Sequence, residues 1–592
     1  MLDLVWPPLA AFLLAVVLTL LIRPVALMAG VVAVPKEDRW HRGRIPLLGG
    51  VAIVGAVLVV AALLPPLPVQ AWTLLGGAAV LSLAGLVDDL RPLSPQAKFL
   101  VQLVITSVLV TAGLQLTVTG YSAADQLITL VWLVGVSNAF NLLDNMDGLA
   151  AGIGLIAAAF RCYFFLQDGN LAGAWLAGAL AGALAGFLVF NFQPASVFMG
   201  DTGSLFIGLM VSGLNVMGPF PYSRGTVAVL LLPVLILLVP LFDTAFVTVA
   251  RTLAGRSVAQ GGRDHTSHRL VALGMSERGA VLTLWAMALV SGGVGVLSYR
   301  FGLPYTATLV GLLLTGVVVL AAKLGLQRVY PERSAATGMV RVLVDFNFKK
   351  QVATVAIDAA LVALAYYSAY ILRFEGGLDQ QLPLFAASLL VVLPCHVLML
   401  GAFKTYQESW RHAGLPDLLR LVGAATAGVA LSMLAVLILF RFEGYSRAVF
   451  VIHWLLLAAF LTASRVLFRA LGELFRGGAA RQGPRTVIYG AGAGGVMVLR
   501  EARANRTLEW TVIGFIDDDR NKQRTSVQGV PVLGTLEQVA PLLASGQIAQ
   551  VVVSTESVRS DRLDALRRLC ADAGVRTLHA SLQFRNAPAT SR

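Results

Sequence analysis

The sequence predicts an all-α polytopic membrane protein with about 11 plus 4 transmembrane helices, followed by a C-terminal cytoplasmic α/β domain of the Rossmann-like kind. Two features of the composition support this: 57% of the 592 residues are hydrophobic and only 13% are charged. A soluble chain carries charge on about a quarter of its residues. The third observation is a change of pattern near residue 484, where short β-rich runs begin to alternate with polar helical segments.

Apolar runs of about 20 residues, the length that crosses a bilayer, recur through residues 1–325. A basic cytoplasmic linker follows at 326–350, then four more apolar runs in a membrane module at 351–475, and then the α/β half-domain at 484–592. The runs expected to span lie at 4–28, 49–66, 71–87, 97–114, 125–142, 149–167, 171–190, 203–219, 226–247, 279–298, 303–323, 352–372, 383–403, 420–440 and 448–468.

Basic residues are distributed unevenly between the loops that join these spans. Loops after odd-numbered spans carry most of the Lys and Arg, whereas the opposite loops carry chiefly Arg224 and Arg300. Because positive charge is retained in the cytoplasm, we expect the odd-numbered loops and the C-terminal domain to be cytoplasmic. These loops also explain the net charge of +13, so no nucleic-acid partner is expected. The loops after spans 1 and 9 hold Lys36, Arg39, Arg42 and Arg44, and Arg251, Arg256, Arg263 and Arg269.

Acidic and amide side chains gather in the same odd-numbered loops. They occur in the stretches GLVDDLRPLSPQAKF, SNAFNLLDNMDGL, NFQPASVFMGDTGS and GGRDHTSHRL. A carboxylate inside a bilayer costs about 2.5–3.5 kcal/mol, so it needs a partner or a task. For one loop alone a solvated helix end is an equally good explanation, but four loops on one face favour a shared site. Hard oxygen ligands beside cations suit the complex of magnesium with a diphosphate.

These four motifs resemble, in the same order, those of the polyprenyl-phosphate N-acetylhexosamine-1-phosphate transferase family, over about residues 1–325. The resemblance implies a transferase that depends on Mg²⁺, or alternatively Mn²⁺, in the inner membrane of a bacterium. It would transfer an N-acetylhexosamine 1-phosphate from a UDP-sugar to undecaprenyl phosphate and release UMP. This reaction would be the first membrane step of cell-surface polysaccharide synthesis. We also expect a homo-oligomer, most simply a dimer.

The resemblance implies roles for individual residues as well. Asp201 and Asn141 would hold the metal ion, and Lys98 would bind the diphosphate. Asp88 would deprotonate the lipid phosphate, although a phosphate with a second pKa near 6 is already mostly dianionic at pH 7. The expected catalytic residues are Asp88, Asp89, Lys98, Asp144, His265 and His268.

Other positions that match the motifs would bind substrate. The uridine would lie against the second and third motifs, with Phe198 stacked on the base. The basic side chains of the first loop and of the last motif would contact the phosphates or the sugar. The expected substrate-binding residues are Asp147, Asn191, Phe198, Arg263, Arg269 and His41.

Three positions depart from the pattern that the motifs resemble. Ala33 stands where an aspartate is usual, Asn145 where glycine is common, and Ser267 in place of the middle histidine of a triplet. The last change argues against the peptidoglycan precursor as substrate and leaves the identity of the hexosamine open.

A glycine-rich turn marks the start of the C-terminal domain. Gly490, Gly492 and Gly495 have G-x-G-x-x-G spacing between a β run and a helix, and Asp517 ends the next β run, at about the 20-residue distance of a ribose-binding acid. Glycines let the backbone approach a diphosphate, and a helix N-terminus stabilises its charge. These four residues are therefore the expected nucleotide-binding residues.

Residues 351–592 resemble the N-terminal part of membrane-bound nucleotide-sugar dehydratases of capsule synthesis. The motifs AYYSAYILRFEG, SWRHAGLPDLLRL and GFIDDD followed by GVPVLGT carry this resemblance. The Y-x-x-x-K pair of a dehydratase does not follow them. We therefore expect this part to be non-catalytic, and to serve either as a nucleotide sensor or as an assembly element.

Two rival functions remain for the whole chain. A transporter or flippase of lipid-linked sugars would also have many spans and buried acids, but its acids would lie in mid-bilayer instead of at one face. A nucleotide-sugar dehydratase would explain the glycine turn but lacks the catalytic pair. The sequence therefore favours a transferase fused to a four-helix module and a cytoplasmic half-Rossmann domain.

Overall fold

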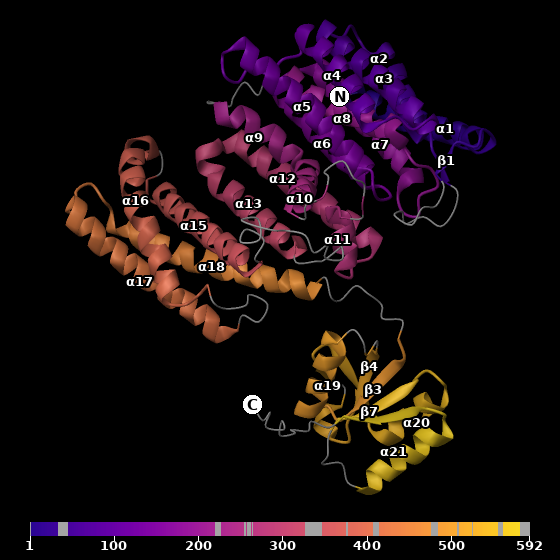
Figure 1. The fold of residues 1–592 in the computed structure, drawn as a ribbon, viewed down its shortest axis with the longest axis vertical. Coiled ribbons are helices and arrows are strands. Elements are labelled where there is room, and N and C mark those ends of the chain that lie inside the picture. Colours follow the sequence, from indigo (N-terminus) through magenta and orange to yellow (C-terminus); the bar gives the residue numbers. More distant parts are fainter. Residues whose placement is uncertain are drawn as a thin grey trace, which may run out of the picture. The chain divides into compact units, whose positions relative to one another are not determined.

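The computed structural model describes residues 2–33, 45–218, 226–253, 256, 262, 264–325, 346–374, 377–406, 414–474, 483–505, 508, 510–523, 525–554 and 560–580. The chain divides into two compact units, Met1–Gly478 and Ala479–Arg592 (Figure 1).

The first unit is helical. Within the described residues, eleven of its helices are long and apolar enough to cross a membrane, or twelve if a bent pair counts as one span. The prediction of a polytopic membrane protein is therefore confirmed, but its count of 11 plus 4 spans is too high for the described residues. The runs expected to span at 49–66 and 97–114 are shorter helices, Gly49–Leu63 and Pro95–Thr111, and Gly200–Met217, in place of the run at 203–219, is not one of the spanning helices. The helices are α1 (Leu2–Met28), α2 (Gly49–Leu63), α3 (Val69–Leu90), α4 (Pro95–Thr111), α5 (Ser122–Leu143), α6 (Leu149–Gln167), α7 (Leu171–Asn191), α8 (Gly200–Met217), α9 (Thr226–Ile236), α10 (Leu238–Leu253), α11 (Thr266–Ala272), α12 (Glu277–Phe301), α13 (Leu303–Gly325), α15 (Phe346–Arg373), α16 (Leu378–Ala402), α17 (Leu415–Phe440) and α18 (Arg447–Leu474).

The apolar run at 226–247, expected as one span, is two helices. Helices α9 and α10 meet at Leu237 with a bend of 84°. Pro240 lies in the first turn of α10, where its missing N–H costs nothing. In a continuous helix, however, its ring would clash with the carbonyl group of Ile236. The break places the following residues, including Asp243, in a separate helix.

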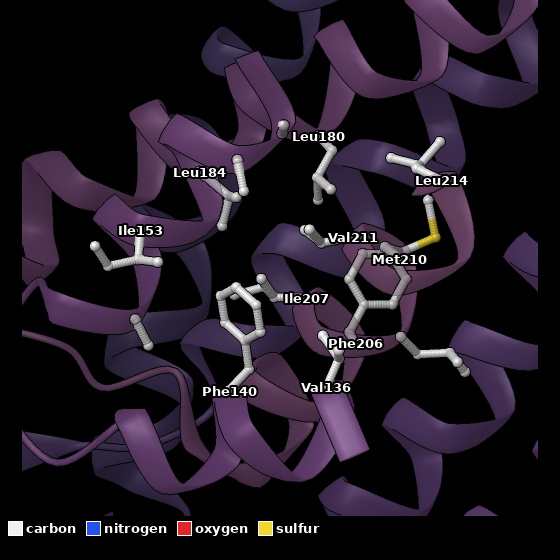
Figure 2. Packing of buried hydrophobic residues seen from close by; sticks show 14 of the residues in the cluster. Val136, Phe140, Ile153, Leu180, Leu184, Phe206, Ile207, Met210, Val211 and Leu214 are labelled. Atoms are coloured by element: carbon white, nitrogen blue, oxygen red, sulfur yellow. The ribbon is translucent and has the colours of Figure 1, made fainter. Parts of the chain in front are cut away.

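Helix α8 is the central helix of the first half. Every residue from Thr202 to Val216 is buried, and a helix that is apolar on all sides belongs in the interior. Figure 2 shows Phe206, Ile207 and Met210 of α8 among side chains of α5, α6 and α7. Because neighbours surround α8, its N-terminal residue pair, Gly200 and Asp201, is held firmly against the ends of other helices.

Helices α15 to α18 form a second helical cluster with its own apolar core. A buried ion pair joins two of these helices: the guanidinium of Arg465 in α18 donates to both carboxylate oxygens of Asp358 in α15, at 2.6 and 2.7 Å. The cluster also contacts α13. Thr308 Oγ1 lies 2.7 Å from Ser368 Oγ, and Lys323 Nζ lies 4.8 Å from the centre of the Phe468 ring.

The second unit is a three-layer α/β fold. Its sheet has the order β5-β6-β4-β3-β7-β8, and all neighbouring strands are parallel except β5 and β6. Helix α19 lies on one face of the sheet, and α20 and α21 lie on the other (Figure 1). The apolar side chains of these helices pack against the sheet. The elements are β3 (Arg485–Tyr489), α19 (Ala493–Ala504), β4 (Thr511–Ile516), β5 (Ser526–Val527), β6 (Val530–Gly534), α20 (Leu536–Ala544), β7 (Gln550–Val553), α21 (Ser560–Asp572) and β8 (Arg576–His579).

Candidate active site

A lysine between two carboxylates forms the centre of the polar cluster. Lys98 Nζ lies 2.6 Å from Asp88 Oδ2 and 2.7 Å from Asp201 Oδ2. The local sequence builds this arrangement: α3 ends just after Asp88, and α4 begins at Pro95 with Ser94 as its N-cap, so Lys98 lies in the first turn of α4. The three side chains keep 27%, 12% and 24% of their surface exposed for Lys98, Asp88 and Asp201 respectively. They are therefore accessible to a ligand.

Asp89 has a different task from Asp88. One of its oxygens accepts from the backbone N–H of Asp201 at 2.9 Å, and the other accepts from the N–H and hydroxyl groups of Thr202 at 3.0 and 2.6 Å. Asp89 thus caps the N-terminus of α8, which stabilises a helix end. Gly200 allows this contact, because a Cβ there would lie 2.4 Å from the Asp89 carboxylate and its φ is +66°. Asp89 therefore positions Asp201.

Two asparagines of α5 border the cluster. Asn141 Nδ2 donates to Ser204 Oγ of α8 at 3.0 Å, which directs Asn141 toward the α8 N-terminus. Asn138 pairs with Gln102 of α4, to which its Nδ2 donates at 2.5 Å. Helices α4, α5 and α8 therefore converge at one polar end of the bundle.

The donor set of this end fits a hard divalent cation. Among the described residues, no group of three or more His, Cys, Asp and Glu could hold a metal ion. Mg²⁺, however, is usually bound by one or two carboxylates, with phosphate and water oxygens completing its shell. Asp201 and Asp88 already flank a cationic group, so their oxygens are arranged around positive charge. The carboxylates, together with the amide oxygen of Asn141, suit that chemistry.

The segment after α5 is tied to the segment after α7. Asp147 Oδ2 accepts from Ala195 N at 2.9 Å. The side chain of Asn191 accepts from Gly148 N at 3.1 Å and donates to Val197 O at 3.0 Å. These two expected uridine ligands therefore join both segments into one rim.

Phe198 connects the same rim to the first loop. Its N–H donates to Pro46 O, and its carbonyl accepts from Gly49 N, both at 2.9 Å. A Cβ on Gly50 would lie 2.2 Å from Gly203 N, so close packing of α2 on the start of α8 requires glycine there. His41 of that loop lies outside the described residues, as does Arg263.

The histidine segment is held by a buried ion pair and by hydrogen bonds from a second arginine. Arg251 pairs with Asp264, with donor–acceptor distances of 2.7 and 2.6 Å. Burial alone would raise the pKa of Asp264, but the hydrogen bonds and charge of Arg251 outweigh it and hold the pKa below its usual value. Arg269 donates to the carbonyl oxygens of Asp264 and Leu324, at 2.9 and 3.1 Å. Arg269 therefore anchors this segment to the end of α13.

Asp243 was not identified from the sequence. It is 2% exposed, and its two oxygens contact His265 Nδ1 at 2.8 Å and Thr266 N at 2.7 Å. It thereby orients the ring of His265, as a carboxylate commonly does for a functional imidazole. The sequence did contain a signal that could have identified it, because an acid within the apolar run 226–247 is unusual. His268 lies in the next turn, with its ring centre 6.2 Å from that of His265.

The fold and this cluster define an integral membrane protein with a partly exposed cluster of charged side chains at one end of its helices. The family model described as Glycosyl transferase family 4 matches residues 71–218, which contain Asp88, Lys98, Asn141 and Asp201. A second model, a CoA-binding domain, matches residues 402–580.

Curated relatives define the family further. A probable undecaprenyl-phosphate N-acetylglucosaminyl 1-phosphate transferase of Bacillus subtilis is 32% identical over 292 residues, which are 47% of this chain and 80% of the relative. A decaprenyl-phosphate N-acetylglucosaminephosphotransferase of Mycolicibacterium smegmatis is 35% identical over 50% of this chain and 82% of its own length. A phospho-N-acetylmuramoyl-pentapeptide-transferase of Geobacillus kaustophilus is 30% identical over 44% and 86%. The chain belongs to the polyprenyl-phosphate N-acetylhexosamine-1-phosphate transferase family, as its motifs predicted.

Proposed function

We propose that the protein transfers an N-acetylhexosamine 1-phosphate from a UDP-sugar to a polyprenyl phosphate, as the first membrane step of cell-surface polysaccharide synthesis. An oxygen of the lipid phosphate attacks the phosphorus that carries the sugar. A new P–O bond forms, the bond to the bridging oxygen breaks, and UMP leaves. The observation that supports this best is the Lys98 ammonium between Asp88 and Asp201 at the ends of apolar helices. There, a lipid phosphate and a water-soluble diphosphate can meet.

Different residues of the chain would bind the two anionic substrates, the UDP-sugar and the lipid phosphate. Asp201 and Asn141 would hold Mg²⁺, or alternatively Mn²⁺, which when bound offsets phosphate charge. Lys98 supplies a second cation, and its position between two acids keeps it protonated and fixed in direction. Asp88 is the candidate to orient the lipid phosphate. Its Oδ1 accepts from Leu93 N at 2.6 Å and its Oδ2 lies 2.6 Å from Lys98 Nζ, so Asp88 can accept a proton only in place of one of these two contacts.

The proposal places this polar end and the C-terminal domain in the cytoplasm of a bacterial cell, with the protein as a homodimer. The basic loops support that orientation. Single cysteines at Lys98 and at Ser122, which lie at opposite ends of the α4–α5 pair, should label from opposite sides of inverted and right-side-out vesicles. Labelling of both from one side would contradict the topology. Light scattering in nanodiscs measures the oligomeric state.

The direct test is transfer of radiolabel to undecaprenyl phosphate from a panel of UDP-sugars, with and without Mg²⁺. The purified protein should label the lipid from at least one UDP-N-acetylhexosamine and release UMP in equal amount. Flipping of a labelled lipid without transfer would instead support the transporter.

A second function is proposed for the α/β unit, which would bind a nucleotide-bearing ligand at its glycine turn. Gly490 has φ of +101°, and Cβ atoms on Gly494 and Gly495 would lie 2.2 and 1.9 Å from backbone oxygens, so the fold itself requires these glycines. Gly492 has nothing within 4 Å of a Cβ. Its lack of a side chain leaves the N-terminus of α19 open, as a phosphate ligand needs.

Asp517 lies beside this turn. Its Oδ2 accepts from Ala491 N at 2.8 Å and lies 3.0 Å from Lys522 Nζ. Calorimetry on the full-length protein should detect binding of NAD or coenzyme A, or of a UDP-sugar at a second site besides the active site, and Gly492→Val should abolish this binding without changing thermal stability. Removal of residues 484–592 should keep basal transfer and remove any response to that ligand. If none of the three binds outside the active site at millimolar concentration, the unit is an assembly element.

A further inference from the structure

A hydrogen bond joins two segments of the candidate active site that lie far apart in the sequence. Ser267 Oγ donates to Asn145 Oδ1 at 2.6 Å, and Asn145 Nδ2 donates to Leu142 O at 2.8 Å. Ser267 is 1% exposed, whereas Asn145 is only partly buried. We call this pair the Asn145–Ser267 clasp.

Each end of the clasp lies within a motif of the site. Asn145 lies between Asp144 and Asp147, in the turn that follows α5, and Ser267 lies between His265 and His268 in α11. The turn is held on its other side by the bond from Ala195 N to Asp147. The clasp therefore connects the rim that carries the expected uridine ligands to α11, whose N-cap is His265 and whose first turn contains His268.

The segment that carries Ser267 is itself immobilised. Asp243 binds Thr266 N at 2.7 Å, and Arg269 donates to the carbonyl of Leu324. Because the donor Ser267 is held in place, its hydrogen bond to Asn145 restrains the turn after α5. Asn145 and Ser267 are also two of the positions at which this chain departs from the motifs that it resembles. The two unusual residues contact each other.

We propose that the Asn145–Ser267 clasp is a positioning pair that sets the affinity of the active site for the nucleotide-sugar. This rests on the proposed transferase function. Holding the turn keeps Asp147 in place at the rim, while the Asp88–Lys98–Asp201 cluster is built by α3, α4 and α8 without the clasp. Its loss should therefore weaken binding of the nucleotide-sugar and spare the lipid phosphate.

The test is a double-mutant cycle with Ser267→Ala and Asn145→Ala. Each single variant should raise KM for the UDP-sugar about three- to tenfold, the range expected for one hydrogen bond, with kcat and KM for undecaprenyl phosphate unchanged. The double variant should be no worse than Asn145→Ala alone, because Asn145→Ala already removes the bond that Ser267→Ala removes, together with the bond to Leu142 O. Ser267→Thr keeps a hydroxyl donor and should keep a low KM.

Ser298→Ala is the matched control, since Ser298 accepts a buried side-chain hydrogen bond from Thr306 at 2.9 Å between α12 and α13. It should leave both KM values unchanged. Additive effects in the cycle, an equal rise in both KM values, or a rise that tracks lost thermal stability would overturn the clasp while leaving the transferase intact. A wild-type protein that transfers no label from any UDP-sugar would overturn both proposals.

Discussion

Two clusters of the same chemistry, a basic side chain between carboxylate oxygens, behave differently in this molecule. Arg465 and Asp358 form a bidentate pair with 3% and 0% of their side chains exposed, so no room is left for another ligand. Lys98 shares two acids that belong to different helices, and all three side chains stay partly exposed. A closed pair holds helices together, whereas an open triad can exchange its partners for phosphate and metal. The exposed fraction of the side chains and the number of carboxylates therefore distinguish an ion pair that only holds helices together from one that can bind a ligand.

The largest expected effect is at the open triad. Asp201→Asn should lower transfer on the order of 10³-fold or more, because several kcal/mol of transition-state stabilisation depend on this carboxylate. Thermal stability should be close to that of the wild type. Asp125→Asn, which changes an acid in the first turn of α5, is the control and should keep activity. Normal radiolabel transfer by Asp201→Asn at saturating Mg²⁺ would rule out its role.

Substitution in the buried Arg465–Asp358 pair should lower stability and leave activity unchanged. Arg465→Met leaves an uncompensated buried acid and should cost about 3–5 kcal/mol of stability, seen as a lower melting temperature with normal specific activity of the folded fraction. Adding Asp358→Leu should recover most of the loss. Lys98→Met should abolish transfer without lowering the melting temperature. If Lys98→Met unfolds the protein and Arg465→Met does not, the distinction drawn above is wrong.

A smaller effect is expected at the rim. Phe198→Ala should raise KM for the UDP-sugar by the equivalent of about 1–3 kcal/mol, the measured range for stacking of a base on an aromatic ring. Phe187→Ala is a useful contrast, because Phe187 is fully buried and its loss should reduce stability instead. An unchanged KM in Phe198→Ala would make Phe198 a packing residue.

The smallest effect concerns pH and the α/β unit. Burial would raise the pKa of Asp517, but hydrogen bonds from Asp519 N, Ala491 N and Lys522 lower it below its usual value. Its contribution to stability is therefore complete above the unfolded pKa of about 3.9 and is lost as pH falls through the lower, folded pKa. Protection of the 485–495 strand and turn against hydrogen exchange in the full-length protein, relative to the intrinsic amide rate at each pH, should fall in that acidic range. Asp517→Asn should remove this pH dependence.

The fold was largely predictable because length and hydropathy decide which segments cross a bilayer. The ends of α3, α5 and α7 lie within a few residues of the expected spans. The break at Leu237 was not foreseen, since Pro240 interrupts a run of uniform hydropathy, and a hydropathy window averages over it. The acids of the site were visible as charges in apolar surroundings. What each one contacts was not: adjacent Asp88 and Asp89 differ only in direction, which depends on how α3 meets α8.

Side-chain contacts between residues distant in the sequence could not be predicted from the sequence either. His265 and Ser267 are recognisable as members of a motif, but the carboxylate of Asp243 and the amide of Asn145 approach them only in the folded chain. Contacts between residues so far apart in the sequence leave no pattern in the local sequence.

The contact between α13 and α18 bears on how this fused chain evolves. Apolar residues at the boundary of the first half tolerate lipid as well as protein, so most of the surface beneath the four-helix cluster could revert to facing lipid at little cost. Lys323 also lies in this contact: it is 6% exposed and its ammonium lies over Phe468. Without α18 this cation would need another partner or a path to the membrane surface. Loss of the second half would therefore favour a change in the conformation or identity of residue 323.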